Sequence, residues 1–245
     1  MSGSKDSMEY AAIMAARLQS LLFEWLSVRL QAAEVAWLRE QTGERGADSR
    51  SVLKSFTLVS RKIPKGSLSL SEGERESAER ALPGWEPDGW ELQEAARATL
   101  LLSAPTMPRA SYLKLCQDLF SCASLSEATA LYKSLSLTRY PAEMLEHAQE
   151  GLRSNITEIF EAVALRNPYP ETFFDENTWN HMILKALAQG IPLNKIRGIC
   201  RRKNRSLTRM LEDLIRERKA AGRELPAEIE ICLDTPPTSK GQEKS

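Results

Sequence analysis

The spacing of apolar residues constrains the fold of this chain more than any other feature, because it follows the helical period almost from end to end. Between residues 8 and 40, apolar side chains recur at steps of three and four: Ala15, Leu18, Leu22, Leu26, Leu30, Ala33 and Trp37. Such steps keep side chains on one face of an α-helix. We therefore expect one long helix here, or two helices nearly in line.

The same period and the residues that typically begin and end helices predict further helices along the chain. They are expected at residues 52–60, 71–82, 90–103, 109–121, 125–135, 141–151, 152–165, 176–189 and from Asn204 or Ser206 to Gly222. Ser71 and Glu74 have the spacing of a capping box, Asp175 suits an N-cap and Gly190 a C-cap. The sequence predicts an all-α fold: a single domain built as an irregular stack of antiparallel helical hairpins, an αα-superhelix resembling HEAT repeats.

The two ends of the chain differ in composition from the part between them. Residues 1–7 are polar and residues 234–245 are rich in Pro, Ser and Lys, so we expect both ends to be disordered around a helical domain at 8–233. The N-terminus lacks the apolar core of a signal peptide, and charges at Arg17, Glu24 and Arg29 interrupt the apolar stretch that follows. These features indicate a cytoplasmic protein without a transmembrane segment.

Charge and cysteine content exclude several classes of function. The chain has 33 basic and 33 acidic residues, which gives no overall preference for nucleic acid. Residues 195–223 hold eleven Lys and Arg against three acidic residues, so an anion is expected there, but Arg201–Arg205 lacks the interleaved aromatic residues of a nucleic-acid surface. The four cysteines lack metal-ligand spacing, and we expect reduced thiols, no metal and no cofactor.

The link between helices 152–165 and 176–189 carries an unusual combination of residues. It runs from Arg166 to Asp175 and contains two prolines and three aromatic residues, which is typical of a rigid segment built for packing or for a ligand. Pro168 restricts Asn167 to extended backbone, and neither proline has an N–H group. The link therefore offers carbonyl groups and Tyr169 as contacts.

Polar residues among the apolar faces of these two helices define a candidate site. Asn180 lies inside the broad apolar arc of helix 176–189, where an amide without partners costs about 1–3 kcal/mol. It is expected to bond the backbone of the link or to face a ligand. Asn155 and Glu158 lie beside the expected core stripe of helix 152–165, which includes Ile156, and with Arg166, Asn167 and Lys185 they are expected to form one polar pocket. The alternative is a buried ion-pair network that holds the link.

Other reactive side chains give weaker signals. Arg209 and Arg218 lie among the apolar residues of the last long helix and are interpreted as structural or ligand contacts. His147 and His181 each lack a neighbouring partner for base catalysis, so we interpret them as surface or core residues. The sequence contains no recognisable catalytic motif.

Several motifs together resemble the EboA family. They are Pro83–Trp90, Ala95–Arg97, Glu161–Pro170, Phe174–Ala186 and Arg209–Arg223. The resemblance spans about residues 50–225 and implies a bacterial protein from a small gene cluster that makes or exports a secondary metabolite. It implies no chemistry for this member. The positions to which it assigns a ligand-binding role are Asn155, Glu158, Arg166, Asn167, Tyr169, Asn180, Lys185, Arg209 and Arg218.

Three functions follow as hypotheses. The first is an accessory protein that binds a small anionic or sugar-like metabolite, or other enzymes of the same cluster. The second is a transferase or isomerase acting on a phosphorylated or prenylated cyclitol-like or sugar-like compound, with Glu158 as acid and base and with Arg166, Lys185 and Arg209 on the phosphate. The third is a helical scaffold for the pathway enzymes.

Overall fold

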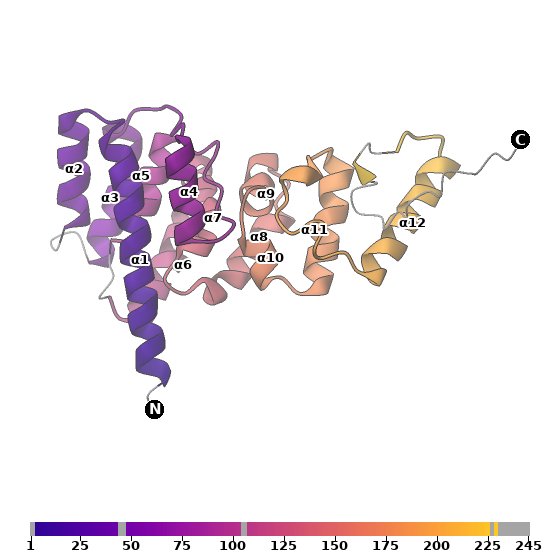
Figure 1. The fold of residues 1–245 in the computed structure, drawn as a ribbon, viewed down its shortest axis with the longest axis horizontal. Coiled ribbons are helices and arrows are strands. Elements are labelled where there is room, and N and C mark those ends of the chain that lie inside the picture. The colour runs from indigo at the N-terminus through magenta and orange to yellow at the C-terminus, as the bar shows by residue number, and fades with distance from the viewer. Residues whose placement is uncertain (1–2, 44–47, 104–106, 226–227, 230–245) are drawn as a thin grey trace, which may run out of the picture. The chain divides into compact units, whose positions relative to one another are not determined.

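A computed structural model describes residues 3–43, 48–103, 107–225 and 228–229, and confirms the all-α prediction over these ranges (Figure 1). The side chains of residues 3–10 are not described. In the described ranges, the one extended feature is an isolated antiparallel bridge between Ser67 and Glu91. The predicted disordered tail at 234–245 and the first two residues of the predicted disordered start lie outside the described residues; α1 already begins at Gly3.

The helices group into two compact units, Met1–Phe173 and Phe174–Ser245. The first unit contains α1 (Gly3–Ser27), α2 (Ala32–Thr42), α3 (Ser49–Lys62), α4 (Glu72–Ala81), α5 (Leu92–Leu101), α6 (Arg109–Cys122), α7 (Leu125–Lys133), the 3-10 helices η2 (Leu135–Leu137) and η3 (Pro141–Met144), α8 (Leu145–Arg153), α9 (Thr157–Ala164) and α10 (Tyr169–Phe173). The second contains α11 (Glu176–Gln189), the 3-10 helix η4 (Leu193–Lys195) and α12 (Arg205–Ala220).

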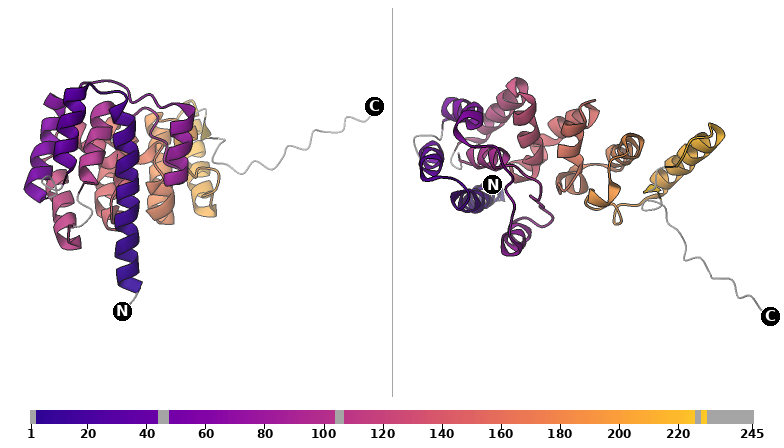
Figure 2. Two further views of the ribbon diagram at one scale, coloured as in Figure 1. Left: turned by 60° about the vertical axis from the view of Figure 1, so that its left-hand side comes forward. Right: turned by 90° about the horizontal axis from the view of Figure 1, so that it is seen from above.

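Helix α5 forms the centre of the first unit. Every residue from Leu92 to Leu101 is buried, and the helix packs against α1, α2, α3 and α7. Figure 2, right, views several of these helices nearly end-on. A helix that is apolar on most of its surface can be stable only when neighbours cover all its sides. Trp85 and Trp90 extend this core, because the ring of Trp85 lies 5.5 Å from that of Trp25 and 5.9 Å from that of Trp90.

The N-terminal stripe is divided between two helices that lie side by side, so the expectation of one helix, or two nearly in line, is wrong (Figure 1). The turn at residues 28–31 is held by Arg29, which makes two hydrogen bonds to the Glu74 carboxylate, at 2.8 and 2.6 Å. Gln31 then begins α2 with a capping box to Glu34. Ala33 of the expected stripe is consequently exposed. The apolar residues on the two sides of the turn keep helical spacing, although they belong to different helices.

The predicted helix 152–165 is interrupted at residues 154–156, between α8 and α9. The Ser154 hydroxyl accepts a hydrogen bond from the Ile156 N–H at 3.1 Å, a local turn that competes with helix formation. Ile156, expected in the core, is 47% exposed as a result. The helix prediction was wrong here because periodicity does not register a turn of three residues.

The link at 166–175 contains the short helix α10, which the sequence analysis does not predict. Pro168 immediately precedes this helix and Pro170 is its second residue, and at a helix start a missing N–H group removes no helical hydrogen bond. Several predicted helix ends are confirmed. The Ser71–Glu74 capping box is present, Asp175 accepts from the Thr178 N–H, Gly190 ends α11 with φ +69°, and Asn204 accepts from the Leu207 N–H.

Candidate functional site

Of the nine residues predicted for a site, three in the first unit make extensive contacts within the protein. The Arg166 guanidinium donates to the Asp88 carbonyl at 3.0 Å and lies against Gly89, whose φ is +82°. The Asn167 amide donates to the carbonyls of Tyr132 and Ala162 and accepts from the Tyr169 N–H. Its polar atoms thus hold the link in place.

Tyr169 is fully buried, and its hydroxyl donates to the Pro141 carbonyl at 2.7 Å. Burial raises the pKa of this phenol. Asn155 and Glu158 differ from these residues, because both are exposed at the α8–α9 connection. Within the first unit the predicted residues therefore comprise a buried structural group and an exposed pair.

The remaining four predicted residues belong to the second unit. Asn180 is buried as predicted, and its amide exchanges two hydrogen bonds with the Asn204 amide, at 3.1 and 2.8 Å. This partner is a side-chain amide rather than the backbone of the link. Next to this pair the Arg202 guanidinium lies 4.6 Å from the centre of the Trp179 ring and donates to the Phe174 carbonyl. The Asn180–Asn204 pair joins α11 to the N-cap residue of α12.

Lys185 is partly buried on α11, which lowers the pKa of its ammonium. Arg209 and Arg218 are nine residues apart on α12, which at about 100° per residue places them on opposite faces of that helix. Arg209 is exposed, whereas the Arg218 guanidinium donates to the Glu224 carbonyl at 3.1 Å. One small ligand cannot contact both arginine side chains on the same face of α12.

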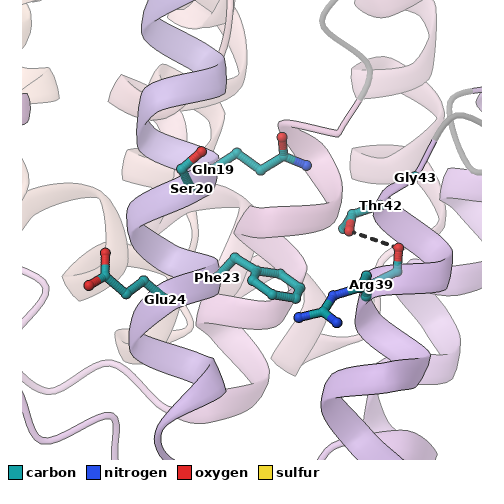
Figure 3. Close-up of a pocket in the computed structure, with 7 residues that line it drawn as sticks. All are labelled: Gln19, Ser20, Phe23, Glu24, Arg39, Thr42 and Gly43. Carbon is teal, nitrogen blue, oxygen red and sulfur yellow. Dashed lines mark hydrogen bonds between the residues drawn. The ribbon is translucent and has the colours of Figure 1, made fainter.

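A hollow of about 390 Å³ lies between α1 and α2 in the first unit (Figure 3). Gln19 and Phe23 of α1 and Arg39 of α2 point toward the space between the two helices, whereas Glu24 points away from α2. The Arg39 guanidinium carbon lies 5.6 Å from the centre of the Phe23 ring, a cation–π distance. The remaining lining residues are Ser20, Thr42 and Gly43.

The polar groups of this pocket differ in how they are used. The hydroxyls of Ser20 and Thr42 donate to carbonyls of their own helices, at 2.9 Å each. The Arg39 guanidinium and the Gln19 amide have no hydrogen bond or ion pair with any residue that the structure describes. The pocket therefore presents a cation and an amide beside an aromatic face, a combination suited to a small polar anion.

Two further hollows lie in the first unit. One, of about 560 Å³, is bounded by α7, the end of α8 and the start of α9. The other, of about 410 Å³, lies between α6 and α8 and includes His147, which stacks on Phe120 with ring centres 4.2 Å apart. Burial lowers the pKa of His147. Among the described residues, no three His, Cys, Asp or Glu side chains come together as metal ligands would.

Comparison with known proteins gives the family. Residues 18–234 match the family model described as "Metabolite traffic protein EboA". The chain belongs to the EboA family. No curated protein and no solved structure matches it. The matched range includes every residue of the α1–α2 pocket, and in this EboA-family chain no described helix combines the length and apolar character needed to cross a membrane.

Sequence reasoning missed the pocket of this EboA-family chain because it treated residues 8–40 as a continuous stripe. Gln19, Phe23 and Arg39 come together only when the chain reverses at residues 28–31. The available signal was Gln31 three residues before Glu34, which has the spacing of a capping box and marks a second helix start. A second omission is Arg97, which is 1% exposed in the middle of α5. The signal that could have found Arg97 is a single arginine among the apolar residues of a predicted buried helix.

Proposed function

We propose that this EboA-family chain is a binding protein in metabolite traffic, and that it holds a small anionic metabolite between α1 and α2. The observation that carries this proposal is the Arg39 guanidinium. It faces a hollow of about 390 Å³ across from Gln19, and it has no hydrogen bond or ion pair with a described residue. A guanidinium is planar and forms two parallel hydrogen bonds with a carboxylate or phosphate.

The other lining groups complete this chemistry. The Phe23 ring offers a flat apolar face to the body of a ligand, and the Gln19 amide both donates and accepts. These groups bind and orient a molecule, which is what transfer of a metabolite requires. Arg39 is exposed, so a ligand reaches it without a rearrangement of the core.

The residues predicted from the sequence do not line the α1–α2 pocket. Asn155 and Glu158 remain exposed candidates for contact with another molecule, and the role of enzymes from the same pathway as partners stays a prediction. The transferase or isomerase alternative also stays a prediction. Its proposed acid and base, Glu158, lies exposed in the first turn of α9.

Native mass spectrometry of the full chain, purified gently from its own organism, tests the proposal. We expect a co-purifying small molecule on the wild-type protein and its loss in Arg39→Ala, since a charge-assisted hydrogen bond contributes about 1.5–3 kcal/mol, or roughly ten- to a hundredfold in affinity. Arg50→Ala is the matched control, because Arg50 is exposed on α3 and does not line the pocket. A molecule retained equally by Arg39→Ala, or a wild-type protein that carries none, would contradict the proposal.

A further inference from the structure

The groove bounded by α7, α8 and α9 has an apolar side that is open to solvent. Leu125 is 48% exposed and Ile156 is 47% exposed, and both line this hollow of about 560 Å³. They are two of the five large hydrophobic residues that the structure describes as exposed. Exposed apolar residues that are scattered singly are ordinary, whereas apolar residues that gather on one surface favour association.

The end of α8 contributes one charge of each sign to the lining of the groove. Glu150 and Arg153 lie three residues apart on α8, which makes them neighbours on the helix surface. Both are exposed, and neither forms an ion pair with the other or with any other described residue. A small anion at Arg153 would therefore also face the Glu150 carboxylate, which disfavours a simple ion as the occupant.

A surface with neighbouring charges of opposite sign is complementary to a copy of itself. In a two-fold dimer the same patch of each copy meets its equivalent. Every contact between two different residues therefore occurs twice, once in each direction across the axis. Across such an axis Glu150 of each copy would meet Arg153 of the other, and Leu125 and Ile156 would be covered. We propose that this groove is a homodimer interface, with two reciprocal Glu150–Arg153 ion pairs between the copies. This inference does not rest on the function proposed for the α1–α2 pocket.

Glu150 and Arg153 are exposed on the single chain, and exposed ion pairs contribute little and are screened by salt, so we expect a weak dimer that is sensitive to ionic strength. We expect sedimentation velocity of the full chain to show reversible dimerisation at concentrations on the order of 100 μM, and less dimer at high ionic strength. Glu150→Arg and Arg153→Glu each place like charges together twice, and each should raise the dissociation constant at least about tenfold. The double variant Glu150→Arg/Arg153→Glu restores the pairs and should dimerise like the wild type.

The apolar side is tested separately. Leu125→Asp should abolish the dimer, and it leaves the fold intact because an acidic residue is favourable in the first turn of a helix. The controls are Val28→Asp, at an exposed hydrophobic position outside the groove, and Lys54→Glu, at an exposed basic position on α3. Both should dimerise like the wild type. Three results would each overturn the proposal. The wild-type chain stays monomeric, the single charge reversals leave the dissociation constant unchanged, or the double variant dimerises no more tightly than the single variants.

Discussion

Arg97 is the residue whose placement is least expected from its chemistry. Its side chain is 1% exposed, its Nη2 donates to the Ser60 hydroxyl at 2.6 Å, and its Nε and Nη1 have no hydrogen-bond partner. The carboxylates of Glu94 and Glu127 are near enough to act on its charge, but both accept hydrogen bonds at helix starts. Burial lowers the pKa of Arg97, which means that the folded state disfavours its charge.

Replacement of Arg97 by methionine tests whether the buried charge destabilises the folded state. Arginine stays charged at every accessible pH, so the cost of burying it is constant. Arg97→Met keeps most of the volume and removes the charge, and we expect the free energy of unfolding to stay unchanged or to rise by about 1–3 kcal/mol. Urea unfolding at neutral pH measures this. A loss of more than about 2 kcal/mol would show that the nearby carboxylates stabilise the buried cation after all.

Glu74 gives the clearest dependence of stability on pH. Its two hydrogen bonds from Arg29 lower the pKa of the carboxyl group from 4.5 to about 2. A lowered pKa contributes stability above the pKa of the unfolded chain, and this contribution is lost as the pH falls from about 5 to about 2. We expect Glu74→Gln to be less stable than the wild type by about 1–3 kcal/mol at pH 7, with the difference shrinking toward pH 2. A difference that does not change with pH would contradict this account.

At the scale of elements, α7, α8 and α9 approach closely at Gly151. A Cβ atom there would lie 2.6 Å from Cε1 of Tyr132 and 2.7 Å from Cγ2 of Val163. Gly151→Ala is therefore expected to lower the free energy of unfolding by about 1–3 kcal/mol through overpacking. Gly73→Ala in α4 is the matched control, because nothing lies within 4 Å of that Cβ position. It should stabilise by about 0.5–1 kcal/mol, the helix preference of alanine over glycine, and equal effects at the two sites would contradict the packing argument.

Elements also show how far the sequence alone reaches. The spacing of apolar residues and the capping residues are enough to assign a segment as a helix. The helix ends predicted at Ser71, Asp175 and Gly190 are confirmed, because helix ends depend on residues close in sequence. The turn at residues 28–31 was missed because the Arg29–Glu74 pair that holds it joins residues 45 apart. The turn at residues 154–156 was missed because hydrophobic periodicity does not register so short an interruption. Asn180 was correctly placed inside, but its partner Asn204 lies on another element. The α1–α2 pocket depends on the first of these turns and could not be predicted without it.

At the scale of the whole molecule, balanced charge limits how a ligand is attracted. With 33 basic and 33 acidic residues the chain has no net charge to guide an anion from a distance, so attraction to Arg39 is local. For the co-purifying anion we expect affinity to fall as ionic strength rises from about 0.05 to about 0.5 M, with a smaller change in Arg39→Ala. Isothermal titration calorimetry measures both proteins. If the affinities of the wild type and of Arg39→Ala depend on salt in the same way, the anion binds a cationic side chain other than Arg39.

The most direct test of the account is the position of the bound molecule. A crystal structure of the full chain with its co-purified metabolite should show the acidic group of that molecule about 2.7–2.9 Å from the Arg39 guanidinium, with Gln19 and Phe23 in contact. A molecule held elsewhere, with the space between α1 and α2 filled only by solvent, would contradict the central claim.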